Sequence, residues 1–239
     1  SADPEHIDNF RRMLLAMVDD VRVVLIKLAE RLYLLRQAVK GDKEDKAQHH
    51  ILAREVSEIY APLANRLGIG QLKWEMEDLA FRLLHSNEYI NIAKSLAEKR
   101  VAREVYVKDV LAIIGDSLKA LHIEADLQGR AKHIFSIWKK MQRKDVGFEE
   151  IYDVRAVRIL VPNVQDCYSV LGVIHGLWKH IPKEFDDYIA NPKENGYRSL
   201  HTAVIGPEGK VMEVQIRTPA MHEEAELGVC AHWRYKGTD

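Results

Sequence analysis

The chain has 239 residues and a mass of 27.5 kDa, which allows one large or two small domains. Apolar residues make up 47% of it, and 35 Lys and Arg balance 36 Asp and Glu, so a basic site for anionic ligands must be local. Every apolar stretch is far shorter than the roughly 20 residues that span a bilayer, so we expect a soluble, cytoplasmic protein with no membrane partner.

The first half of the chain has a helical pattern. Between residues 9 and 120, apolar residues recur at steps of three and four. Glycine-led breaks at residues 41–46 and 68–70 divide this half into about five helices. The sequence therefore predicts that residues 1–120 form an all-helical part.

The second half changes to the period of β-strands. Short runs predict strands at 123–127, 154–161, 199–205 and 211–216, with a turn at 206–209 between the last two. Helices are expected in between, at 134–143, 164–178 and 220–229. We therefore predict an α+β domain over residues 121–239. Both ends of the chain lie close to helical or aromatic patterns, so we expect a fragment of a longer protein.

A basic segment marks the first helix of this domain. Six basic residues and one acidic residue lie between Arg130 and Asp145. Lys132, Ser136 and Lys140 are four residues apart and share one helical face. Two ammonium groups and a hydroxyl near a helix N-terminus suit a polyphosphate, although an ordinary solvated face remains the alternative.

The predicted strand at 211–217 has one apolar and one polar face. Alternation places Glu213, Gln215 and Arg217 together on the polar face. Asp153, at the start of another predicted strand, offers a second carboxylate. Because Mg²⁺ prefers oxygen ligands, Asp153 and Glu213 are candidate metal ligands, unless each merely pairs with an arginine.

A loop at residues 187–202 carries a different set of groups. Asn-Pro and Asn-Gly both mark turns in it. Lys193, Asn195, Tyr197 and His201 provide a cation, an amide, an aromatic face and an imidazole, a set that suits a base and its phosphates. A buried structural tyrosine and a hydrogen-bonded histidine are the alternative.

Together these segments resemble the RelA/SpoT homologues, the stringent-response enzymes that make the alarmone (p)ppGpp. The matching motifs lie at residues 129–141, 152–156, 191–197 and 213–218. The resemblance implies a nucleotidyltransferase-like mixed sheet flanked by helices. It also implies transfer of the β,γ-pyrophosphate of ATP to the 3′-OH of GDP or GTP, giving ppGpp or pppGpp and AMP.

The resemblance implies a role for each donor-side residue. Arg130 and Arg158 would clamp the adenine, in keeping with the stacking ability of guanidinium planes. Lys132, Ser136 and Lys140 would hold the ATP phosphates, which agrees with their shared helical face.

The two carboxylates would act at the centre of the site. By resemblance, Asp153 would bind Mg²⁺, and Glu213 would help to hold the metal and act on the 3′-OH as general base. Strict alternation puts Asp153 and Arg158 on opposite faces of one strand, so a bulge or an early strand end is needed.

On the acceptor side, the resemblance implies that Tyr197 stacks on guanine with Asn195 beside it. Lys193 and His201 would lie near the acceptor phosphates. The acidic residues at 184–187 resemble the signature of RelA-type, synthesis-only members, which suggests Mg²⁺ dependence and some preference for GDP over GTP.

Residues 27–35 resemble the last hydrolase motif of the family, but two positions differ. Glu30 stands where a metal-binding Asp is expected, and Leu34 where a catalytic Asn is expected. A leucine cannot hydrogen-bond or ligate a metal, and no His-Asp dipeptide occurs in the chain. We therefore expect no (p)ppGpp hydrolysis, and interpret residues 1–120 as a degenerate hydrolase remnant with connecting helices.

Two other functions remain as alternatives. A nucleotidyltransferase-like enzyme with another acceptor usually has a Gly-Ser dipeptide, which this chain lacks. A non-catalytic guanine-nucleotide sensor would need a disrupted carboxylate pair, whereas Asp153 and Glu213 are both present. Full-length family members associate with ribosomes through C-terminal domains, so we expect a ribosome partner only for a longer protein.

Overall fold

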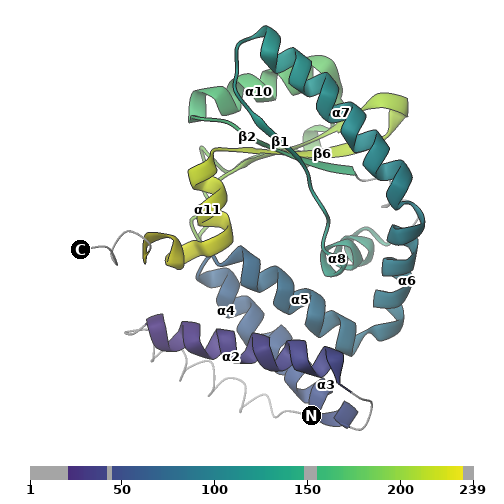
Figure 1. The fold of residues 1–239 in the computed structure, drawn as a ribbon, viewed down its shortest axis with the longest axis vertical. Coiled ribbons are helices and arrows are strands. Elements are labelled where there is room, and N and C mark those ends of the chain that lie inside the picture. Colours follow the sequence, from purple (N-terminus) through teal and green to yellow (C-terminus); the bar gives the residue numbers. More distant parts are fainter. Residues whose placement is uncertain (1–20, 42–44, 148–154, 234–239) are drawn as a thin grey trace.

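A computed structural model describes residues 21–41, 45–147 and 155–233 of the chain (Figure 1). Its first part is helical, as predicted, and the α3–α4 stretch is one continuous helix with a π-helical turn, η3, in its middle. The helices are α2 (Val21–Lys40), α3 (Lys46–Glu55), η3 (Val56–Tyr60), α4 (Ala61–Arg66), α5 (Gly70–Leu84), α6 (Ser86–Glu98) and α7 (Arg100–Ala120). No helix in these described ranges is long and apolar enough to cross a membrane.

The second part is a six-stranded mixed sheet, which confirms the α+β prediction. Its strands are β1 (Asp126–Gly129), β2 (Arg155–Leu160), β3 (Lys179–His180), β4 (Asp186–Asp187), β5 (Leu200–Ile205) and β6 (Val211–Arg217). The order is β1-β2-β6-β5-β3, with β4 paired to β5; among these described strands the β2–β6 pair is parallel and the other four pairs are antiparallel. The two-residue strands β3 and β4 were not predicted, because so short a run shows no alternation.

The predicted strand at 123–127 is wrong in its first three residues. Helix α7 continues to Ala120, and His122 then adopts a positive φ of 56°. The Ile123 amide donates to the Leu118 carbonyl at 3.0 Å, which closes the end of the helix. The turn at residues 121–122 thus delays the strand, and residues 123–125 lead without regular structure to β1, which starts at Asp126.

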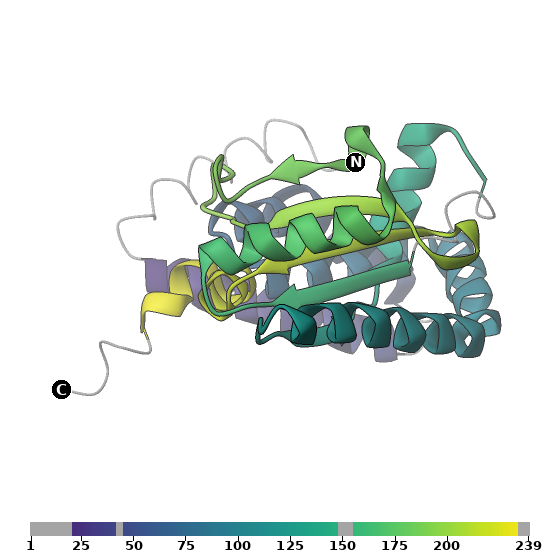
Figure 2. The same cartoon turned by 90° about the horizontal axis from the view of Figure 1, so that it is seen from above.

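Helices α7 and α10 (Val164–Leu177) cover one face of the sheet (Figures 1 and 2). The core between them consists of apolar side chains from both helices and from the three longest strands: Tyr106, Val110, Ile114, Leu118, Val157, Ile159, Val161, Cys167, Val170, Ile174, Leu200, Val204, Met212, Val214 and Ile216. Helix α7 therefore shares the core of the sheet, although it precedes residue 121 in the chain.

The opposite face of the sheet is turned toward α8 (Ile134–Lys144), α5 and α11 (Pro219–Leu227) (Figure 1). An aromatic cluster joins α5 to α8, with the Phe81 and Trp138 ring centroids 4.9 Å apart. At the other end of α5, Gly228 has a φ of 52°, and an added Cβ there would lie 2.3 Å from the Leu67 carbonyl oxygen. Helix α5 thus connects the helical part to both α8 and α11.

Candidate functional site

The polar face of β6 borders a cavity of about 710 Å³ between the sheet, α5 and α8. Met212, Val214 and Ile216 are buried on the far face, as the alternation predicted. Several residues predicted for the site line this cavity, namely Arg130, Lys132, Ser136, Lys140, His201 and Glu213. They come from three separate stretches of the chain, namely residues 130–140, β5 and β6, and the pairing of β5 with β6 brings the last two together.

The centre of this cavity is an ion triplet. Lys132 Nζ lies 2.6 Å from Glu213 Oε2, and Lys140 Nζ lies 2.8 Å from Glu213 Oε1. Burial alone would raise the pKa of Glu213, but the two ammonium groups outweigh it and hold this pKa at about 2. Burial lowers the pKa of Lys132 to about 8, although Glu213 opposes this shift. The carboxylate is therefore ionised at neutral pH.

Of the two arginines predicted for adenine, Arg158 lies on β2 and Arg130 directly follows the neighbouring strand β1. The Arg130 amide donates to the Ala156 carbonyl at 2.8 Å, and its guanidinium lies 6.0 Å from the Trp74 ring centroid. Arg158 Nε donates to Gln215 Oε1 at 3.3 Å. Burial and the nearby positive charges of Arg217 and Arg130 lower the pKa of Arg158 to about 10. Both arginines thus belong to one cationic region beside the ion triplet.

The predicted acceptor residues line a second cavity, of about 410 Å³, which shares Arg130, His201 and Gln215 with the first. Tyr197 Oη lies 2.6 Å from His201 Nε2 and accepts from Arg217 Nη2 at 3.2 Å. The Lys193 ammonium lies 5.3 Å from the Tyr197 ring centroid. A cation, an aromatic ring and an imidazole are therefore adjacent here.

The Asn195 amide is engaged with the backbone. Its Nδ2 donates to the Asn65 carbonyl at 2.9 Å, and its Oδ1 accepts from the Tyr197 amide at 3.1 Å. In this arrangement the side chain anchors the loop to α4. It would have to leave these partners in order to contact a base.

His201 is held in its neutral form. Burial, followed by the charges of Arg217, Lys193 and Arg130, lowers its pKa to about 3. A neutral imidazole can form a hydrogen bond with the Tyr197 hydroxyl. A protonated imidazole would be repelled by the three basic groups.

Sequence reasoning did not assign the cavity residues that come from the helical part. Lys73 and Trp74 of α5 line the second cavity, and Lys73 also lines the first. Helical periodicity describes one helix at a time and gives no signal for a contact across domains. The Arg217 guanidinium was placed on the polar face, but its complete burial was not foreseen.

Asp153 lies outside the described residues, so its predicted contact with Glu213 stays a prediction. The described part of β2 begins at Arg155, and Ala156 pairs with Glu213 in the register. An ionised Glu213 facing a cavity fits Mg²⁺, which binds one or two carboxylates together with substrate phosphates. The described ranges contain no group of three or more His, Cys, Asp or Glu side chains arranged for a metal ion.

The acidic residues at 184–187 contact two helices and the loop that follows them. Glu184 pairs with Lys144 at the end of α8, at 3.0 Å. Asp187 accepts from the Tyr168 hydroxyl at 2.8 Å and from the amides of the loop that follows it. These contacts join the acidic segment to α8 and α10.

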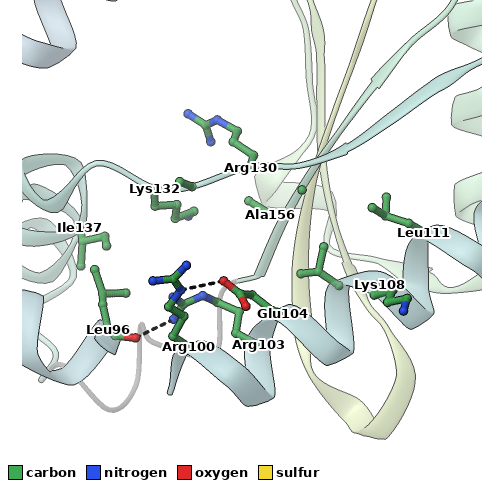
Figure 3. A pocket seen from close by; sticks show the side chains of 13 residues that line it. Leu96, Arg100, Arg103, Glu104, Lys108, Leu111, Arg130, Lys132, Ile137 and Ala156 are labelled. Atoms are coloured by element: carbon green, nitrogen blue, oxygen red, sulfur yellow. Dashed lines mark hydrogen bonds and ion pairs between the residues drawn. The ribbon is translucent and has the colours of Figure 1, made fainter. Parts of the chain in front are cut away.

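A third cavity, of about 630 Å³, lies between the start of α7 and the β1–α8 connection (Figure 3). Arg100 in its wall pairs with Glu104 at 2.7 Å, and Arg103 Nη1 donates to a backbone carbonyl of α6 at 3.3 Å. The Arg130 guanidinium points away from α7 in Figure 3. Glu213 does not line this cavity, which we therefore do not include in the candidate site.

The hydrolase-like motif lies on α2, and Figure 1 shows α5 between α2 and the sheet. Glu30 Oε2 lies 3.3 Å from Lys27 Nζ, and Leu34 is exposed on the helix surface. Neither side chain faces one of the cavities described above.

Two family models match the chain. Residues 129–239 match one described as a region found in RelA / SpoT proteins, and residues 1–70 match one described as an HD domain. These matches cover most of the sheet part and the first helices.

Curated relatives match nearly the whole chain. A GTP pyrophosphokinase of Photobacterium angustum is 58% identical over 236 residues, which cover 99% of this chain and 31% of that protein. A GTP pyrophosphokinase of Escherichia coli is 57% identical over the same length, with the same coverage. The chain thus spans about a third of the length of these relatives.

Among solved structures, the small alarmone synthetase 1 of Bacillus subtilis bound to its product pppGpp is 26% identical. It aligns with a TM-score of 0.46, over 61% of this chain and 84% of that one.

Proposed function

Because the chain belongs to the RelA/SpoT family, we propose that it transfers the β,γ-pyrophosphate of ATP to the 3′-OH of GDP or GTP. The observation that carries this proposal is the Glu213 carboxylate held between Lys132 Nζ and Lys140 Nζ, at 2.6 and 2.8 Å, beside a cavity. A bound polyphosphate can replace Glu213 as the partner of both ammonium groups, which leaves the Glu213 carboxylate next to the reacting phosphates.

On the donor side, the ATP phosphates would be bound by Lys132, Lys140 and the Ser136 hydroxyl. Arg130 and Arg158 would hold the adenine through their guanidinium planes. This division is supported by the cavity, which Lys132, Ser136 and Lys140 line together from one helix and the residues before it. Cations placed in advance stabilise the charge that develops during phosphoryl-type transfer.

Glu213 would be the general base. With a pKa of about 2 it is a weak base while both lysines contact it. When the lysines move to the phosphates, burial remains and raises that pKa, so the carboxylate can take a proton. The 3′-oxygen then bonds to the β-phosphorus, the bond from that phosphorus to the α–β bridging oxygen breaks, and AMP leaves.

A magnesium ion would bind beside Glu213. Glu213, together with Asp153, would hold Mg²⁺, which would neutralise charge on the ATP phosphates when bound.

For the acceptor, Tyr197 would stack on the guanine, and Lys193 and His201 would lie near the phosphates of GDP or GTP. The cavity shared by these residues adjoins the ion triplet through Arg130 and His201. Asn195 would act beside the base only after leaving its two backbone partners.

We further propose that the chain synthesises (p)ppGpp without hydrolysing it, as in RelA-type members of the family. Glu30 and Leu34 replace the two polar groups expected in the hydrolase motif. The acidic residues at 184–187 support a preference for GDP over GTP.

The test is incubation of γ-labelled ATP with Mg²⁺ and either GDP or GTP, followed by thin-layer separation. The proposal requires labelled ppGpp or pppGpp together with AMP, and faster turnover of GDP. Release of free pyrophosphate with a nucleotide attached to another acceptor would instead identify a different nucleotidyltransferase. Binding of GDP without any product would identify a sensor. Manganese-dependent release of pyrophosphate from ppGpp would contradict the absence of hydrolysis.

A further inference from the structure

The connection between β1 and α8, which carries Arg130 and Lys132, rests on helix α5 of the helical part. Asp78 of α5 reaches the start of α8 with both carboxylate oxygens. Its Oδ1 accepts from the Phe135 amide at 2.9 Å, and its Oδ2 lies 3.3 Å from His133 Nδ1. A residue far away in the sequence therefore contacts the first turn of the phosphate-binding helix.

This contact supplies what α8 lacks locally. The N-cap position of α8 is His133, whose side chain makes no capping hydrogen bond. The first amides of a helix have no partner within it and need an acceptor, which is usually a Ser, Thr, Asp or Asn at the N-cap itself. Asp78 provides that acceptor from another helix, and its negative charge is favourable at a helix N-terminus.

Trp74 holds the same connection one helical turn earlier on α5. Its ring stacks on His133 with centroids 5.1 Å apart and an interplanar angle of 26°, and it lies 6.0 Å from the Arg130 guanidinium. Trp74 and Asp78 are four residues apart, so they share one face of α5. Between them they fix the residues on both sides of Lys132.

We propose that Asp78 is a positioning residue for the ATP side of the site. By fixing the first turn of α8, it sets where Lys132, Ser136 and Lys140 stand relative to the phosphates. The inference rests on the proposed function, because it assigns those three side chains to ATP. The acceptor residues Tyr197 and His201 are held by other contacts, so Asp78 should affect ATP and not GDP.

The test compares Asp78→Ala, Asp78→Asn and a control, Glu75→Gln, in the full chain. Steady-state kinetics give kcat and the KM values for ATP and for GDP, and hydrogen exchange follows the Phe135 amide. In Asp78→Ala we expect a rise of about tenfold in the KM for ATP, the size of a lost helix cap, with the KM for GDP unchanged. Exchange at the Phe135 amide should accelerate.

The conservative variant should recover most of the loss. In Asp78→Asn the amide oxygen can still accept from the Phe135 amide, so the KM for ATP should stay close to that of the unchanged chain. Glu75 lies on the same helix, but its carboxylate pairs with Arg36 of α2 in a surface ion pair. Glu75→Gln should therefore leave both KM values and the exchange of Phe135 unchanged.

Equal rises in both KM values in Asp78→Ala, or unchanged exchange at Phe135, would overturn the inference, because Asp78 would then act only on general stability or not at all. If the unchanged chain makes no labelled product, the proposed function fails separately. Exchange at Phe135 then still decides whether Asp78 caps α8.

Discussion

Helix α2 and strand β6 both carry a family-like motif, yet the two motifs are used differently. In α2 the apolar positions Leu28, Leu32 and Leu35 are buried in the core of the helical part, whereas Leu34 lies exposed at a position where a polar group is expected. In β6 the apolar face is equally buried, but the polar face is enclosed, and Glu213 is only 25% exposed between two lysines.

The difference separates what holds an element in place from what forms a site. The buried leucines hold α2 in the core of the helical part, whatever side chains its exposed positions carry. Strand β6 retains charged groups where they are costly to bury, and such groups require partners. An enclosed, fully paired ion triplet is therefore better evidence of a site than the resemblance of a motif alone.

The largest expected effect comes from Glu213→Gln. The amide keeps the size of the side chain but cannot take a proton from the 3′-OH, so synthesis should fall by about 10²–10⁴-fold, while ATP and GDP still bind. Product formation from labelled ATP and equilibrium binding of both nucleotides measure this. The matched control is Glu30→Gln in the motif of α2, which should retain full synthesis. Comparable losses in the two variants would remove the contrast between α2 and β6.

Tyr197→Ala tests the acceptor side of the same enclosed region. Loss of a ring that stacks on a base should weaken GDP binding by about 1–3 kcal/mol, and ATP binding much less. Tyr197→Phe keeps the ring and removes only the hydroxyl contacts with His201 and Arg217. Its affinity for GDP should therefore lie between those of the unchanged chain and Tyr197→Ala. Calorimetric titration with each nucleotide gives the comparison. Similar losses for GDP and ATP would contradict the assignment to guanine.

Gly228→Ala tests whether the stability of the chain depends on the contact between the end of α11 and the α4–α5 turn. The new Cβ would lie 2.3 Å from the Leu67 carbonyl oxygen, and the residue has a positive φ, so we expect a destabilisation of about 1–3 kcal/mol. Urea unfolding measures it. The control is Gly172→Ala, within α10, where an added Cβ has no neighbour within 4 Å and favours the helix. A variant as stable as the unchanged chain would mean that α11 and the α4–α5 turn can separate freely.

The effect that is confined to acid pH is a pH dependence of stability that His201 contributes. Its pKa is about 3 in the folded chain against an ordinary value of 6.5, so between these values the unfolded chain binds more protons. Stability from this group is therefore complete above about pH 6.5 and falls as the pH drops toward 3. Urea unfolding of the unchanged chain and of His201→Asn at pH 7 and pH 4 should show the larger loss in the unchanged chain. Equal losses would place His201 in a more open environment.

The sequence allowed the local parts of this arrangement to be predicted. Ser136 and Lys140 share a face of α8, as the helical period predicts, and the position of Glu213 opposite the core follows from strand alternation. Lys132 was predicted on the same helical face but lies in the connection before α8, from where it lines the same cavity. Both patterns act over a few residues and are visible without coordinates. The magnesium contact of Asp153 stays a prediction, because that residue lies outside the described ranges.

Contacts between distant segments could not be predicted in the same way. Nothing in the pattern of α5 indicates that Asp78 caps α8, or that Trp74 stacks on His133, because both contacts depend on how α5 packs against the start of α8. The short strands β3 and β4 exist only because β5 lies beside them. The late start of β1 depends on the turn at His122, a residue type with no strong turn signal.

Strand β6 lies between β2 and β5, although it is the last strand within residues 155–233. While the protein is being made, β2 and β5 can have no common neighbour until residues 211–217 have left the ribosome. The β5–β6 hairpin is local and can form first, but its parallel pairing with β2 requires closing a long loop, which is slow. Since that hairpin carries both His201 and Glu213, these side chains come beside the residues that follow β1 only when β6 pairs with β2. A translation product that ends before residue 211 would lack Glu213 and the strand that holds it.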